Sequence, residues 1–229
     1  MVRNLARASY RFTLDGQYRA ITLLRWFRAD TLHQTTPLTR IDRYPQLFSA
    51  CRDWFCGRPE IRILSFGCST GEEVITLRRY FPRAHLIGAE INPWSLAHCR
   101  RLQVDGRIAF VSPDRATLEQ HGPFDLIFCM AVLQRTPHRV EADGITNLKR
   151  IYPFERFDQQ VRELDALLKK DGILVIHHSQ YFFRDSSVAA RYEPLESSGV
   201  RSYITRFDRN SQLAEKAASD GSMFLKTRD

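Results

Sequence analysis

The stretch from Arg62 to Glu73 reads Arg-Ile-Leu-Ser-Phe-Gly-Cys-Ser-Thr-Gly-Glu-Glu, and it predicts the fold of the chain. Ile63, Leu64 and Phe66 form a short apolar run, typical of a strand buried on both faces. Small residues then interrupt the run, and Glu72 and Glu73 begin a segment with helical periodicity, where carboxylates suit the positive end of the helix dipole. A strand, a tight turn of small residues and a helix N-terminus together form a nucleotide cradle, because glycine lets the backbone approach a ligand closely.

The spacing of the small residues indicates which kind of nucleotide the turn suits. Gly67, Ser69 and Gly71 are spaced by two, whereas a dinucleotide-binding turn follows G-x-G-x-x-G and leaves its helix N-terminus free for a pyrophosphate. Glu72 and Glu73 would repel a pyrophosphate, but they suit a ligand that carries positive charge. An ordinary strand-to-helix turn that needs small residues is the alternative interpretation.

Residues 67–73, Gly-Cys-Ser-Thr-Gly-Glu-Glu, resemble the first motif of methyltransferases that use S-adenosylmethionine (SAM). They look most like the version of this motif in chemotaxis receptor glutamate methyltransferases. The resemblance implies that Gly67, Cys68, Ser69 and Gly71 bind SAM, whose amino and sulfonium groups are positive.

Size and composition limit the class of protein. The 229 residues, 43% of them hydrophobic, are enough for a full core, and no run of about 18 apolar residues predicts a membrane span. Five cysteines, an odd number without a C-x-x-C pair, favour a reducing compartment, so we expect a cytoplasmic protein. The scattered histidines predict no metal site.

The net charge of +8 is concentrated near the N-terminus, where residues 1–60 hold ten arginines and five acids. Nucleic acid or an anionic substrate fits this charge. No block of basic residues and no interleaved aromatic platform accompanies it, so nucleic acid is not favoured over a small acidic molecule. A solvated, arginine-rich surface is the simpler alternative.

Two domains are expected. Residues 1–60 form an N-terminal helical cap, with helices predicted at 18–28 and 44–55. From residue 61 strands and helices alternate, which predicts an α/β fold with a doubly wound, mostly parallel sheet in residues 61–229. By resemblance to SAM methyltransferases this sheet has seven strands.

Acids follow the next two predicted strands, 85–89 and 108–111. Glu90, with Ile91 beside it, lies about twenty residues after the glycine turn and is placed to accept the two ribose hydroxyls. Asp114 lies just past the third strand, where methyltransferases often keep an acid for the adenine amino group. A helix predicted at 94–103 separates the two strands. The alternative interpretation of Glu90 is a surface acid near the cap of this helix. The alternative interpretation of Asp114 is a turn residue without a binding role.

The apolar run 124–130 predicts a central fourth strand that ends at the topological switch point, so Cys129 and Met130 are expected to face the methionine part of the cofactor. This run and Val132-Leu133 again resemble the chemotaxis methyltransferases. That family has Arg-Asn where this chain has Met130-Ala131, so a polar side chain expected near the reacting centre is missing. The departure argues against glutamate methyl-ester formation.

The remaining chain completes the predicted sheet. Residues 136–152 form a long crossing, 154–170 a helix and 173–177 the fifth strand, with lysines in the last turn of the helix. Three apolar segments follow, 192–195, 203–207 and 221–226, and an antiparallel hairpin among them would close the sheet.

Two residues are candidates for catalysis. His178 leaves the fifth strand at the ligand end of the sheet and would serve as a general base, the alternative being a polar strand terminus. Residues 39–43, followed by Phe48, loosely resemble a chemotaxis-family element, which implies that Arg43 lies over the cofactor or the substrate carboxylate. A surface arginine is the alternative.

Together the resemblance implies a SAM-dependent methyltransferase. We expect an oxygen or nitrogen acceptor, on a small and acidic molecule or on a protein carboxylate. Methyl transfer depends mainly on alignment, so no catalytic dyad is expected. The alternatives are a chemotaxis-type carboxyl methyltransferase, a SAM-binding regulatory module without catalysis, and a nicotinamide oxidoreductase, which the glutamates and the spacing disfavour.

Overall fold

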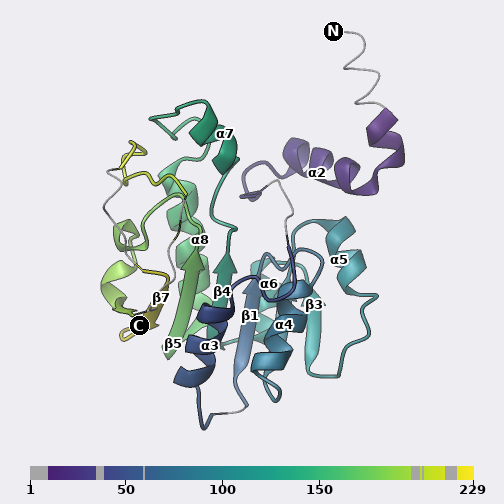
Figure 1. The fold of residues 1–229 in the computed structure, drawn as a ribbon, viewed down its shortest axis with the longest axis vertical. Coiled ribbons are helices and arrows are strands. Elements are labelled where there is room, and N and C mark those ends of the chain that lie inside the picture. The colour runs from purple at the N-terminus through teal and green to yellow at the C-terminus, as the bar shows by residue number, and fades with distance from the viewer. Residues whose placement is uncertain (1–9, 35–38, 59, 197–201, 203, 215–220) are drawn as a thin grey trace.

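The computed structural model describes residues 10–34, 39–58, 60–196, 202, 204–214 and 221–229 (Figure 1). Its centre is a seven-stranded sheet with the strand order β3-β2-β1-β4-β5-β7-β6. The strands are β1 Arg62–Phe66, β2 His85–Ala89, β3 Ile108–Val111, β4 Phe124–Met130, β5 Leu168–His177, β6 Tyr192–Leu195 and β7 Met223–Lys226. The first five are parallel, and β7 pairs antiparallel with both β5 and β6. The predicted fold class, a doubly wound and mostly parallel seven-stranded sheet, is confirmed.

The order of the strands reverses at β1. From β1 the chain moves outward through β2 to β3 and then crosses to β4 on the other side of β1. The carboxyl ends of β1 and β4 therefore lie side by side, while the connections that leave them run in opposite directions. Ligands of open α/β sheets bind at such a switch point.

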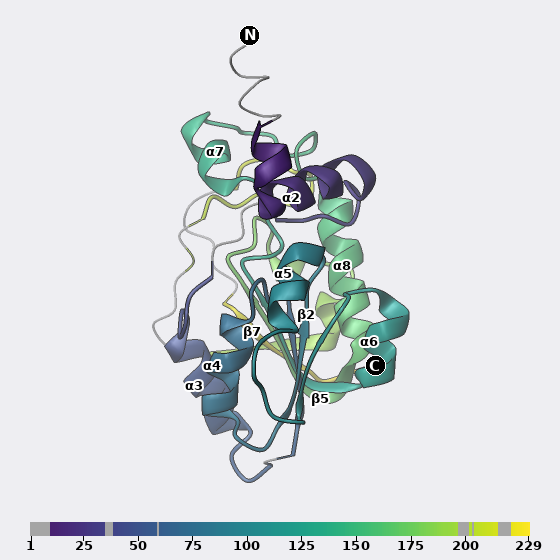
Figure 2. The same ribbon diagram turned by 90° about the vertical axis from the view of Figure 1, so that its right-hand side faces the viewer.

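Two layers of helices cover the sheet because residues of the inner strands point alternately to its two faces. One core cluster combines Leu64 and Ile127 with apolar residues of α6 and α8, and the other combines Ile63 and Leu126 with those of α3, α4 and α5. The helices of the first layer are α6 Arg115–His121 and α8 Phe154–Leu167, and those of the second are α3 Pro45–Trp54, α4 Glu72–Tyr80 and α5 Pro93–Cys99. Figure 2 shows α3 and α4 on one side of the sheet and α6 and α8 on the other.

Several boundaries differ from those predicted. Helix α8 ends at Leu167, and the lysines expected in its last turn belong to β5 instead. The Lys169 ammonium lies 2.8 Å from the Asp125 carboxylate of β4, and Asp171 adopts a positive φ of 61°. Residues 168–170 therefore form the start of β5, held by this ion pair and by strand pairing with β4, where a last helical turn was predicted from local charge alone.

Other elements were missed or overextended. Helix α5 ends at Cys99, and both α6 and the short α7 Pro137–Ala142 lie in segments where no helix was expected. The short 3₁₀ turns η1 Phe183–Asp185 and η2 Ala189–Arg191 precede β6. Residues 204–207 form no strand, and Tyr203 lies outside the described residues.

The two N-terminal helices differ in their packing. Leu47, Phe48 and Cys51 of α3 belong to the core beside the sheet. Helix α2 Gly16–Phe27 instead lies beyond the carboxyl ends of the strands, next to α5, with α7 on the other side (Figure 1). The division of the chain at residue 60 stays a prediction. Within the part of the chain that the structure describes, no helix is long and apolar enough to cross a membrane.

Candidate active site

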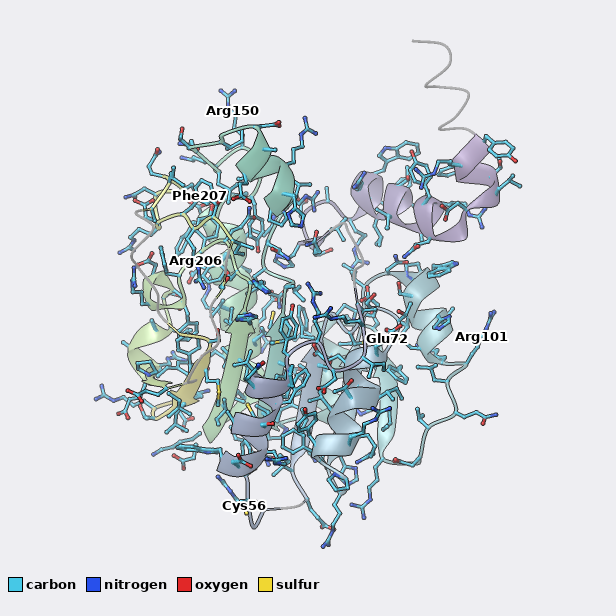
Figure 3. The ribbon with its side chains drawn as sticks, viewed as in Figure 1. Cys56, Glu72, Arg101, Arg150, Arg206 and Phe207 are labelled. Atoms are coloured by element: carbon cyan, nitrogen blue, oxygen red, sulfur yellow. The ribbon has the colours of Figure 1, made fainter. Side chains whose placement is uncertain are left out.

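A cavity of about 700 Å³ opens at the carboxyl ends of the parallel strands, beneath α2 and α7. Its volume is in the range of small-molecule sites. Predicted site residues from six segments line it: Gly67, Ser69, Glu90, Ile91, Asp114, Met130, Arg43 and His178. Figure 3 shows Glu72 at the start of α4, at this same end of the sheet. The topology therefore brings together residues that are more than a hundred positions apart in the chain.

The turn after β1 needs glycine at its first position. Gly67 has a φ of 80°, and a Cβ atom there would lie 2.4 Å from Cγ2 of Val132. Its N–H donates to the carbonyl oxygen of Ala89 at 2.8 Å, which ties the turn to the end of β2. The absent side chain thus lets β1, β2 and the segment after β4 meet at the cavity.

Glu90 holds the turn against the segment that follows β2. Its carboxylate accepts hydrogen bonds from the backbone N–H groups of Ser69, at 2.8 Å, and Asn92, at 2.7 Å. Burial raises the pKa of Glu90, although these backbone donors oppose the rise. A carboxylate has about four acceptor positions, so capacity remains for hydroxyl groups of a ligand in the cavity.

Buried polar atoms on the cavity wall fit a polar ligand. Among the described residues, the side-chain oxygens of Ser69, Ser95 and Gln134 are buried without a hydrogen-bond partner, and all three residues line the cavity. The amide nitrogen of Gln134 donates to the Ala131 carbonyl at 2.9 Å, which leaves its oxygen as the unsatisfied atom. Since buried polar groups are normally paired, a ligand with hydrogen-bond donors suits this wall.

Asp114 caps a helix and also borders the cavity. Its carboxylate caps α6 by accepting from the Thr117 N–H at 3.0 Å and the Thr117 hydroxyl at 2.9 Å, and these hydrogen bonds lower the pKa of Asp114. The residue also lines the cavity. A structural cap and a ligand contact are therefore compatible.

Three predicted site residues do not line the main cavity. Gly71, with a φ of 99°, begins α4 and packs near Leu102, and Cys68 faces a second, smaller hollow. Cys129 is fully buried in the core on the α8 face of the sheet, and burial raises the pKa of its thiol. The structure corrects the expectation for Cys129: alternate residues of a strand face opposite ways, so Met130 reaches the cavity wall and the Cys129 side chain does not.

The smaller hollow, of about 30 Å³, is lined by Glu73, which the sequence analysis did not name as a site residue. Glu73 lines it with Arg43 and Tyr44 and accepts a hydrogen bond from the Ser65 hydroxyl at 2.8 Å. Burial raises the pKa of Glu73 to about 7, against the opposing effect of Ser65 and Arg43. Helical spacing could have predicted this position, because Glu73 lies four residues before the buried Leu77 and therefore on the inner face of α4.

The two candidate catalytic residues, His178 and Arg43, both line the cavity. The His178 ring is 5.8 Å from that of Tyr44, and its Nδ1 is 3.2 Å from the Ser202 hydroxyl. Burial, with the nearby charges of Arg43 and Arg206, lowers the pKa of His178 to about 4. His178 is therefore neutral at pH 7, which suits hydrogen bonding better than strong base catalysis.

No group of three or more histidine, cysteine, aspartate or glutamate side chains in the described residues is arranged to hold a metal ion.

The site belongs to an α/β domain with a nucleotide-type turn at its switch point. Residues 63–153 match the family model described as "Methyltransferase domain" (Methyltransf_25). This segment runs from β1 to the start of α8 and carries the cavity residues of the glycine turn, Glu90, Asp114 and Met130. The segment is thus similar to a methyltransferase domain, the class of domain that the sequence motif indicated. The finer likeness to the chemotaxis enzymes stays a prediction.

Relatives cover parts of the chain. A trans-aconitate 2-methyltransferase of Methylobacterium nodulans is 38% identical over 77 residues, 34% of this chain and 29% of the relative. Among solved structures, the SAM-bound amino pentose methyltransferase CalS10 of Micromonospora echinaspora is 24% identical over 60% of this chain and 51% of that one, with a TM-score of 0.41. PKMT2 of Rickettsia typhi is 18% identical over 52% of this chain and 21% of its own, with a TM-score of 0.39. The chain thus spans less than a third of the curated relative.

Proposed function

We propose that this chain is a SAM-dependent methyltransferase that acts on an oxygen or nitrogen atom of a small, acidic molecule. The observation that carries the proposal is the position of Glu90, which holds the glycine turn and borders the cavity within a methyltransferase domain. A chain of this fold needs such a carboxylate to bind ribose hydroxyls.

The residues present fit the cofactor. Glu90 would hold the ribose, Ile91 and Asp114 the adenine, and the backbone at Gly67 and Ser69 the sulfur-containing end. Glu73 and Arg43, at the smaller hollow, have charges that complement an amino group and a carboxylate. When bound, SAM supplies a methyl group activated by a sulfonium, so the protein contributes mainly alignment of the acceptor.

Charge and hydrogen-bonding groups support an acidic acceptor. Arg28, Arg43, Arg115 and Arg139 line the cavity beside Glu90, Asp114, Glu141 and Glu163. The guanidinium groups can pair with the carboxylates of an acidic acceptor. The relative from Methylobacterium nodulans is named for a small acid, trans-aconitate. The neutral His178 and the amide oxygen of Gln134 would orient the acceptor by hydrogen bonds. A protein glutamate is a less suitable acceptor, because Met130-Ala131 lacks the polar group expected for that chemistry.

Calorimetric titration of the purified chain with SAM, S-adenosylhomocysteine and NAD tests the cofactor. We expect one-to-one binding of both adenosyl-sulfur ligands and none of NAD. Glu90→Ala should weaken SAM binding by about tenfold or more, which is the effect of losing about 1.4 kcal/mol. Glu119→Ala, at an exposed ion pair with Arg115, should leave SAM binding unchanged. Binding of NAD alone would overturn the proposal.

Turnover distinguishes an enzyme from a SAM-binding module. With SAM bound, formation of S-adenosylhomocysteine is measured in the presence of trans-aconitate and other small di- and tricarboxylic acids, and of hydroxyl- and amine-bearing acids. Formation of S-adenosylhomocysteine that depends on an added acid supports the proposed acceptor class. SAM binding without turnover on any acceptor would favour the non-catalytic module instead.

A further inference from the structure

The N-terminal helical region exposes a group of large apolar side chains. We define the N-terminal apolar patch as Tyr10, Leu14, Leu23, Trp26 and Phe27, whose exposed fractions range from 38% for Leu23 to 75% for Phe27. Large apolar side chains exposed on one region of a protein surface mark a candidate interaction site.

The patch is distinct from the face of α2 that packs on the protein. Ala20 and Leu24 are buried, and Leu24 lines the cavity. Leu23, Trp26 and Phe27 are spaced by three and four residues, so they form a stripe along the helix that borders this buried face. The Phe12 ring stacks on Trp26 with centroids 6.3 Å apart, which joins the preceding helical turn to this surface.

The charge around the patch indicates the chemistry of its partner. Besides Arg28, which lines the cavity, residues 10–28 contain the three arginines 11, 19 and 25 but a single acid, Asp15. The Asp15 carboxylate is engaged by the Tyr18 N–H at 2.9 Å and lies 3.5 Å from Arg11. Arginines beside exposed Trp, Phe and Leu are typical of helices that lie in the interface of an anionic membrane.

A second copy of the chain suits the patch less well. In a two-fold interface the same surface is used by both subunits. The arginines beside the patch would then face one another without acids to offset them.

We propose that the N-terminal apolar patch binds the surface of an anionic lipid bilayer. Trp26 and Phe27 enter the headgroup region, and the flanking arginines contact lipid phosphates. The attachment is peripheral and does not depend on the methyltransferase proposal.

Co-sedimentation of the full chain with lipid vesicles tests this. We expect binding to vesicles of phosphatidylcholine mixed with phosphatidylglycerol, weakened by salt, and little binding to phosphatidylcholine alone. The double variant Trp26→Ser/Phe27→Ser should bind the anionic vesicles about tenfold or more weakly. Trp54→Ser is the matched control, since Trp54 is 42% exposed on α3 at the opposite end of the sheet (Figure 1) and should change nothing.

Further measurements keep the result decisive. Circular dichroism and SAM titration establish that the double variant is folded, and Arg25→Glu, at an exposed position of α2, should weaken vesicle binding without removing any apolar group. Equal binding by the double variant and the original chain would overturn the proposal. The proposal would also be overturned if the original chain did not bind vesicles and light scattering showed that it forms a dimer which the double substitution converts to a monomer.

Discussion

Gly67 and Val132 illustrate how single residues shape the candidate site. The positive φ of Gly67 and the 2.4 Å approach of Val132 to its missing Cβ are separate constraints. Gly57 shares the first constraint, with a φ of 84°, but a Cβ there would meet nothing within 4 Å. The two glycines therefore separate backbone strain from steric collision.

Replacing each glycine by alanine measures the two effects. Gly57→Ala should lower the free energy of unfolding by about 1–2 kcal/mol, the cost of the left-handed conformation. Gly67→Ala should cost about 1–3 kcal/mol more, because Val132 must also move. Urea denaturation of both variants gives the difference. Equal losses would mean that the Val132 side chain relaxes at little cost.

At the scale of elements, Asp165 connects α8 to the antiparallel edge of the sheet. Its carboxylate accepts from the Tyr192 hydroxyl at 2.8 Å and lies 2.6 Å from Arg191 and 3.2 Å from the buried Lys226 ammonium. Lys226 also donates to the Asp165 and Leu168 carbonyls. One acid therefore holds β6 and β7 against the helix that precedes β5.

Asp165→Ala should lower the free energy of unfolding by about 3–5 kcal/mol, because it leaves the Lys226 charge buried without its carboxylate partner. The control is Glu60→Ala, at exposed ion pairs with Arg83 and Arg107, which should cost less than about 1 kcal/mol. Chemical denaturation compares them. A cost for Asp165→Ala as small as the control's would show that water replaces the lost carboxylate.

At the scale of the whole molecule, His33 ties the segment after α2 to the opposite side of the cavity. Its Nδ1 lies 2.6 Å from the Tyr152 hydroxyl and its Nε2 lies 3.1 Å from the Gln160 amide oxygen. Arg135 adds hydrogen bonds to the Leu32 and His33 carbonyls. The N-terminal segment is thus connected across the cavity to residues more than a hundred positions later.

This connection should weaken in acid. Burial lowers the pKa of His33 from 6.5 to about 4, so between these values the unfolded chain binds more protons than the folded one. The contribution of the neutral His33 to the free energy of unfolding is therefore complete above pH 6.5, and it falls by about 3 kcal/mol as the pH drops to 4. His33→Gln should remove this part of the acid sensitivity, measured by urea denaturation at pH 7.5 and 4.5. His85→Gln, at an exposed position, should retain it, and identical pH profiles for all three proteins would contradict the assignment.

Local pattern was enough for much of the fold and part of the candidate site. The predicted start of α4 and the predicted bounds of β2, β3 and β4 agree with the structure, because apolar runs and flanking glycine, proline and aspartate act over a few residues. The boundary between α8 and β5 was wrong because the partner of Lys169, Asp125, lies 44 positions earlier.

The sequence by itself determined the type of domain, the glycine turn and the acid at the tip of β2, since each depends on neighbours along the chain. Only the tertiary structure decided that Cys129 faces the core, that the half-buried Glu73 lies in the small hollow with Arg43 and that His33 reaches Tyr152. Burial and long-range hydrogen bonds depend on which strands and helices pack together. Those contacts join residues that are far apart in the chain, so local sequence patterns do not predict them.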